Sequence, residues 1–169
     1  MKFVVYREKH YNLTKFILGM PCYDSLRNDL DEKKPMQSIS GIIYLILIAC
    51  LLPYVFTIIA KKTAGFRAKD NQHPREFLAK TTGLAARANA AQQNSFESLP
   101  LFIAAILMAE YMVIPQVVTM TFGIAYLVFR VVYGICYLAN WSTLRTIVWL
   151  LSLLCPICLL LLVIRLTMG

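Results

Sequence analysis

The sequence predicts an all-α integral membrane protein built as a four-helix up-and-down bundle, and three observations support this prediction. Hydrophobic residues make up 59% of the 169 residues and charged residues only 15%, whereas an ordinary soluble domain is about 45–50% apolar and about 25% charged. The apolar residues gather in four stretches, each near the length of about 20 residues that a helix needs to cross a bilayer. Short connections join the second, third and fourth stretches, as in an antiparallel bundle.

The four predicted spans differ in how purely apolar they are. The first is uncharged, contains Pro53 and ends at Lys61 and Lys62, and the proline is expected to kink it. The second carries polar residues in its first half, the third is interrupted only by Arg130, and the fourth is uncharged. Together they form a membrane domain over residues 41–166, with predicted limits of 41–60, 84–112, 115–140 and 146–164.

Residues 1–40 precede the membrane domain as a polar and amphipathic extension. Apolar and charged residues alternate around residues 3–18, a pattern that fits a helix lying in the membrane interface and a solvated tail equally well. Residues 24–35 are polar. Both alternatives stay open from the sequence alone.

Basic residues dominate the connection between the first two spans. The chain has a net charge of +8, and residues 61–80 contain six basic residues against Asp70 and Glu76. The positive-inside rule places such a loop in the cytoplasm, although Lys33 and Lys34 flank the other end of the first span. No interleaved basic and aromatic pattern accompanies the charge, so no nucleic-acid partner is predicted. The predicted partner is the lipid bilayer.

Polar groups within the second and third spans each occupy one helical face. An ionisable group inside a membrane helix costs about 2.5–3.5 kcal/mol on insertion scales, so it must face a partner helix or a watered cavity. At about 100° per residue, Arg87, Asn94 and Glu97 fall within an arc of roughly 80°. One polar site between the two spans is the economical explanation. The aligned residues of the third span, within roughly 60°, are Tyr126, Arg130, Tyr133 and Tyr137.

Each of these residues also has a purely structural interpretation. Glu97 would neutralise an arginine of a neighbouring helix, Asn94 would hydrogen-bond across an interface, and Arg87 would extend to the headgroups. Tyrosines near the ends of spans form interfacial belts. The two histidines, His10 and His73, lie in polar segments without ligand spacing, so no metal site is predicted.

Residues 87–102 read RANAAQQNSFESLPLF and resemble the second-helix signature of the MAPEG family, the membrane-associated proteins in eicosanoid and glutathione metabolism. That signature has Arg, then Asn-x-x-Glu, then Pro-x-Phe. The stretch from Arg130 through Tyr133 and Tyr137 to Arg145 resembles the family's third helix and the start of its fourth. The resemblance covers about residues 41–166 and points to a MAPEG-like bundle of four spans.

The resemblance implies a homotrimer that holds glutathione as co-substrate between subunits, near the cytoplasmic face. In the family, the second-helix asparagine and glutamate hold the polar backbone of glutathione, and third-helix arginine and tyrosines line the same cavity. An arginine at the start of the fourth helix is proposed to stabilise the thiolate, and Arg145 matches this catalytic residue. The binding residues implied by the resemblance are Arg87, Asn94, Glu97, Arg130, Tyr133 and Tyr137.

Two positions depart from the family pattern. Many catalytic members carry a further arginine seven residues before the glutamate, where this chain has Ala90. Gln93 stands where some members have another basic residue. Loss of one carboxylate partner removes about 1.5–3 kcal/mol of charged hydrogen bonding.

The functional prediction is a membrane-embedded transferase or peroxidase that uses glutathione, or a related thiol, on hydrophobic small molecules. The alternative is a non-catalytic protein of the same fold, whose polar stripes serve trimer packing or lipid binding. A third alternative, a small transporter subunit, has less support because the sequence shows no broken helix and no repeat.

Overall fold

The computed structural model describes residues 35–168, and every regular element in that range is a helix. The all-α prediction is therefore confirmed for the described residues, whereas residues 1–34 of the predicted extension lie outside them. Two short elements, the 3-10 helix η1 (Ala68–Gln72) and α4 (Pro74–Ala79), lie between the first two long helices. The four long helices are α3 (Pro35–Thr63), α5 (Gly83–Tyr111), α6 (Gln116–Leu138) and α7 (Ser142–Met168).

Three of the long helices, α3, α6 and α7, are long and apolar enough to cross a membrane. Helix α5 has sufficient length, because its 29 residues extend about 44 Å at 1.5 Å per residue. It does not reach the same hydropathy, since its first half contains ionisable and amide side chains. The described residues thus provide three candidate spans, and the passage of α5 through the bilayer stays a prediction.

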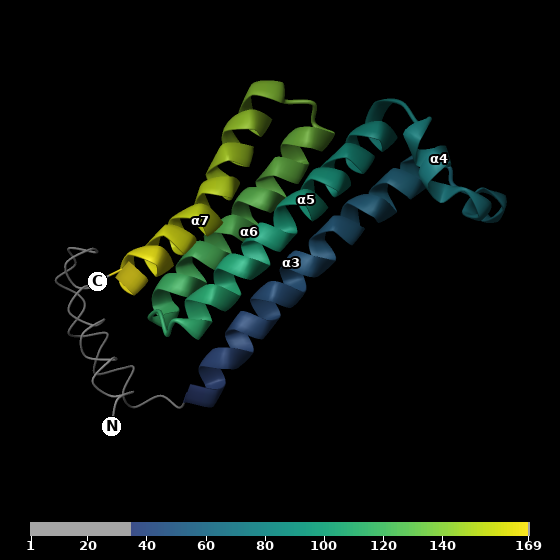
Figure 1. Ribbon diagram of the computed structural model, residues 1–169. Helices are drawn as coiled ribbons and strands as arrows, with labels where there is room; N and C mark the ends of the chain where they lie inside the picture. The colour runs from purple at the N-terminus through teal and green to yellow at the C-terminus, as the bar shows by residue number, and fades with distance from the viewer. Residues whose placement is uncertain (1–34, 169) are drawn as a thin grey trace.

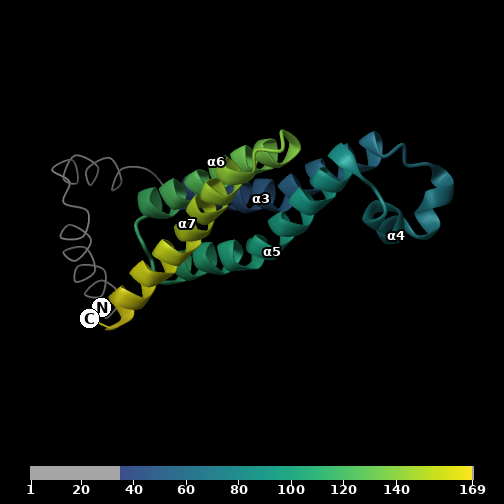
Figure 2. The ribbon, with the colours of Figure 1, turned by 90° about the horizontal axis from the view of Figure 1, so that it is seen from above.

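The four long helices lie side by side, each antiparallel to the one before it (Figures 1 and 2). Helices α5 and α6 are both central, because each of them contacts the other three long helices. The start of α3 and the end of α7 lie at one end of the molecule (Figure 1). Helix α4 and the turn between α6 and α7 lie at the other end, so both connections are on the same side.

The inner faces of the long helices form a continuous apolar core. Phe102 and Ile106 of α5 and Leu159 of α7 are almost completely buried there. The outer faces expose many large hydrophobic side chains, among them Ile43 and Ile58 of α3. Large exposed apolar patches are rare on proteins in water, so these faces fit helices that contact lipid tails.

Two glycines allow α3 and α6 to approach closely. A Cβ atom on Gly123 would lie 2.6 Å from Cδ2 of Leu45, and one on Gly134 would overlap the ring of Phe56. Small residues at such positions let membrane helices bring their backbones together. The contact therefore depends on the absence of side chains at two positions of α6.

The connection between α6 and α7 differs from the sequence-based limits. The predicted fourth span starts at residue 146, whereas α7 starts at Ser142. The N–H of Arg145 already donates to the carbonyl oxygen of Trp141 at 3.0 Å. Asn140, just after α6, has a φ of 63°, a left-handed conformation that asparagine tolerates better than most residues. Arg145 consequently belongs to the first turn of α7 rather than to the connection.

Candidate functional site

The polar stripe of α6 faces the interior of the subunit. Tyr126, Arg130 and Tyr133 are 2%, 1% and 3% exposed, and Tyr137 is partly buried. Spacings of three and four residues place all four side chains on one face of the helix. That face is covered by neighbouring helices, so these polar groups do not face the lipid.

The guanidinium group of Arg130 lies between two aromatic rings. Its Cζ atom is 5.4 Å from the ring centroid of Tyr126 and 5.3 Å from that of Tyr133. All three side-chain nitrogens are buried and have no hydrogen-bond partner among the described residues. Cation–π contacts of this kind contribute about 2 kcal/mol or more when they are desolvated. They are the stabilising contacts that the described structure offers to this buried charge.

Tyr126 connects the stripe to the centre of α5. Its hydroxyl group is 2.8 Å from Oγ of Ser98, and its ring stacks on that of Phe102 with centroids 4.0 Å apart. Neither Ser98 nor Phe102 is among the predicted site residues. The signal that would have found Ser98 is its helical phase, which is about 20° from that of Arg87.

The stripe continues from Tyr133 to the start of α7. The rings of Tyr133 and Tyr137 meet edge to face, with centroids 5.3 Å apart. The Cζ atom of Arg145 lies 4.4 Å from the ring centroid of Tyr137. Two tyrosine rings in contact thus link a buried arginine to the predicted catalytic arginine. We call Arg130, Tyr133, Tyr137 and Arg145 the arginine–tyrosine row.

Arg87 has a structural partner within the same chain. Its Nε atom donates to the carbonyl oxygen of Leu138, the last residue of α6, at 3.2 Å. The final carbonyls of a helix lack partners within the helix, and a cation there also interacts favourably with the helix dipole. The guanidinium group of Arg87 therefore caps α6 and ties it to α5.

Asn94 and Glu97 do not contact the arginine–tyrosine row within the described residues of the chain. The Nδ2 atom of Asn94 donates to the carbonyl oxygen of Ala90 on its own helix, at 3.0 Å. Glu97 is exposed on the outer face of α5, as is Gln93. In the described part of the chain, neither Asn94 nor Glu97 makes a hydrogen bond or ion pair with the row.

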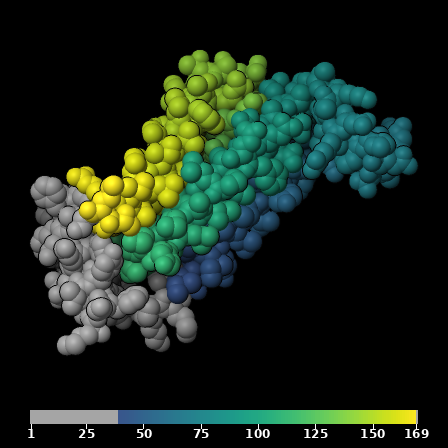
Figure 3. Space-filling view, viewed as in Figure 1, coloured from purple at the N-terminus to yellow at the C-terminus, as the bar shows by residue number. Residues whose placement is uncertain are grey.

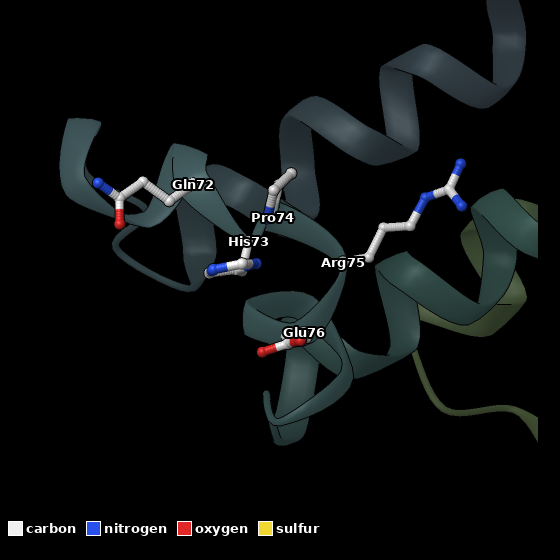
Figure 4. Close-up of a pocket in the computed structure, with 5 residues that line it drawn as sticks. All are labelled: Gln72, His73, Pro74, Arg75 and Glu76. Carbon is white, nitrogen blue, oxygen red and sulfur yellow. The ribbon is translucent and has the colours of Figure 1, made fainter.

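Two further features carry no recognisable chemistry. Residues 35–168 contain no group of three or more histidine, cysteine, aspartate or glutamate side chains that could hold a metal ion. A shallow depression of about 350 Å³ lies between η1 and α4 (Figure 4). Its side chains do not converge, since those of Gln72 and Arg75 point in opposite directions (Figure 4). The arginine–tyrosine row therefore remains the candidate site.

The fold and this row define the class of the protein: an all-helical membrane protein with a cationic, tyrosine-lined interior. The MAPEG family model matches residues 41–165. The chain therefore belongs to the MAPEG family, whose members are membrane proteins, often trimers, and include glutathione transferases. The resemblance identified from the motifs is confirmed. The comparisons with curated proteins and with solved structures gave no match.

Proposed function

We propose that this protein is a membrane-embedded transferase or peroxidase that uses glutathione, or a related thiol, on hydrophobic small molecules. The observation that carries the proposal is the arginine–tyrosine row, which ends in the partly buried Arg145. In this proposal α5 is the fourth membrane-crossing helix, and the 61–80 connection lies on the cytoplasmic side. Membership of the MAPEG family supports the use of glutathione in general, and the arginine–tyrosine row offers the side chains that would carry out the reaction.

Arg145 has the surroundings that favour a thiolate. A thiol with a pKa near 8.5 is mostly protonated at neutral pH, and a nearby cation favours the nucleophilic thiolate. Arg145 lies in the first turn of α7, where the helix dipole adds positive potential. The ring of Tyr137 limits where its guanidinium group can lie. Arg130 is buried between the rings of Tyr126 and Tyr133. It contributes positive potential to the site without contacting the thiol.

The chemistry balances with glutathione and a membrane-dissolved second substrate. In transfer, the thiolate sulfur forms a bond to an electrophilic carbon, and the leaving group departs with the electron pair of the broken bond. In peroxide reduction, two thiols are oxidised to a disulfide while the hydroperoxide becomes an alcohol and water. In this proposal the hydrophobic substrate reaches the site from the lipid that the exposed apolar faces of the helices contact.

Glu97 supports a homotrimer with sites between subunits. It lies fourteen residues from Gly83, or about 21 Å along α5, and is exposed. A carboxylate facing lipid at such depth costs about 2.5–3.5 kcal/mol, and a second copy covering this face removes that cost. The same packing brings Glu97 and Asn94 toward a neighbour's arginines. Glutathione, with two carboxylates and one ammonium group, complements such a mixed set.

A non-catalytic role is the second candidate, and two observations favour it. Arg87 and Asn94 already have hydrogen-bond partners in their own subunit. Ala90 stands where many catalytic relatives have an arginine. In that case the row serves only to hold α6 and α7 together.

Titration of glutathione into the full-length protein in detergent separates the two functions. We expect saturable heat of binding, together with conjugation of an aryl halide or reduction of an organic hydroperoxide. Arg145→Ala should abolish turnover, whereas Arg165→Ala, at the other end of the same helix, should not. No binding and no turnover up to millimolar glutathione would overturn the enzymatic proposal.

A further inference from the structure

Residues 61–80, which we call the basic excursion, comprise the last turn of α3 and most of its connection to α5. The connection projects beyond the ends of both helices (Figures 1 and 3). The excursion contains η1 and α4. Its acidic residues are Asp70 and Glu76. Its six basic residues, which leave a net charge of +4, are Lys61, Lys62, Arg67, Lys69, Arg75 and Lys80.

The acidic residues do not neutralise this charge locally. The carboxylate of Asp70 accepts a hydrogen bond from the backbone N–H of Arg67 at 2.8 Å, which caps η1. Within residues 35–168 no side-chain ion pair involves the excursion. Lys61 is partly buried, with Nζ 4.4 Å from the ring centroid of Phe66. The five cations that are exposed to solvent are Lys62, Arg67, Lys69, Arg75 and Lys80.

A small apolar cluster packs the basic excursion against the long helices. The rings of Phe66 and Phe77 meet edge to face with centroids 5.2 Å apart. Leu78 is buried against Ala60 of α3 and Ala88 of α5. The excursion is therefore anchored to the ends of two long helices, and its charges have a defined arrangement.

The hydrogen bond between Arg87 and Leu138 fixes the height of the excursion relative to the rest of the subunit. It places Arg87 level with the end of α6, and α5 extends only four residues, about 6 Å, beyond that point. Trp141, directly before α7, is 56% exposed, as expected of an aromatic residue at a membrane interface. The start of α5, where the excursion joins it, lies about one helical turn beyond this level, which we take as the depth of the lipid headgroups.

We propose that the basic excursion docks on the phosphate groups of anionic phospholipids in the leaflet on its own side. Juxtamembrane basic clusters are attracted to anionic lipid surfaces, and arginine binds phosphate oxygens with well-directed hydrogen bonds. The two phenylalanine rings pack on each other, so they are not available to stack nucleic-acid bases. This proposal does not depend on the proposed enzymatic function.

Hydrogen–deuterium exchange of the full-length protein in nanodiscs tests the proposal. We expect amides of residues 66–80 to exchange several-fold more slowly with phosphatidylglycerol than with phosphatidylcholine alone. Raised salt should remove the difference, because it screens exposed charges. The triple variant Arg67→Gln, Lys69→Gln, Arg75→Gln should also lose it. The matched control Arg67→Lys, Arg75→Lys keeps the charge and should keep the protection.

Equal exchange in the two lipids would overturn the proposal. Protection that persists in the glutamine variant would do the same, because the charges would then not be responsible. Protection that appears only after addition of polyglutamate would assign the excursion to an acidic polypeptide instead. Exchange in α5 and α6, recorded in the same experiment, shows whether each variant retains the fold.

Discussion

Helices α5 and α6 each carry a polar stripe, but the structure gives the two stripes different surroundings. On α6 the side chains lie inside the subunit and contact one another through rings and a guanidinium group. On α5 the three predicted residues have different contacts. Arg87 donates to the end of α6, Asn94 donates to its own helix, and Glu97 is exposed.

The difference follows from where each stripe lies on its helix. The α6 stripe is narrow and coincides with the buried face, so all of its members meet the same interior. The α5 stripe is wider and lies between the buried face and the outer face, so its members meet different surroundings. Helical phase therefore shows which residues share a face, whereas the neighbours of that face decide whether they share a site.

Among the substitutions that test this comparison, the one at Glu97 should have the largest effect on glutathione binding. We expect Glu97→Gln to weaken glutathione binding by about ten- to a hundredfold, because a hydrogen bond to a charged group contributes about 1.5–3 kcal/mol. Isothermal titration calorimetry measures the affinity. Glu110→Gln, the same change on the same helix, is the control and should bind normally. Unchanged affinity in Glu97→Gln would assign the α5 stripe to packing alone.

The next effect concerns how Tyr137 holds Arg145. We expect Tyr137→Leu to lower kcat about five- to thirtyfold, because a partly buried cation–π contact contributes about 1–2 kcal/mol. Tyr137→Phe keeps the ring face and should keep kcat. Steady-state kinetics with varied glutathione separates the two roles of the residue. A kcat that falls as far in Tyr137→Phe as in Tyr137→Leu would contradict this and assign the effect to the hydroxyl group rather than to the ring.

Much of the fold and part of the site could be predicted from the sequence. Apolar length and charge position predicted the helices, and phase predicted that Arg130 and the tyrosines of α6 share a face. The capping of α6 by Arg87 could not be predicted, because it depends on how far α5 extends past α6. The bond between Ser98 and Tyr126 depends likewise on the axial offset between two helices, and the sequence of one helix does not contain that offset.

A smaller effect is expected at Arg130, whose side chain is buried without a hydrogen-bond partner. We expect Arg130→Met to weaken glutathione binding about tenfold, or about 1.4 kcal/mol, because the site loses positive charge. Thermal unfolding should show equal or higher stability, since apolar replacement of buried charges is often neutral or stabilising. A clear drop in Tm would contradict this and show that the row mainly holds the helices together.

The smallest effect should be at Arg87, and it concerns stability rather than binding. Arg87→Met removes the bond to the carbonyl oxygen of Leu138, so we expect a loss of about 1 kcal/mol in the free energy of unfolding. Glutathione affinity should not change, because the guanidinium group is engaged at the end of α6. Arg87→Lys keeps the cation near the helix end and should recover part of the stability through the helix dipole. Weaker binding at unchanged stability would confirm the prediction that Arg87 is a binding residue, and the α5 stripe would then act as one site.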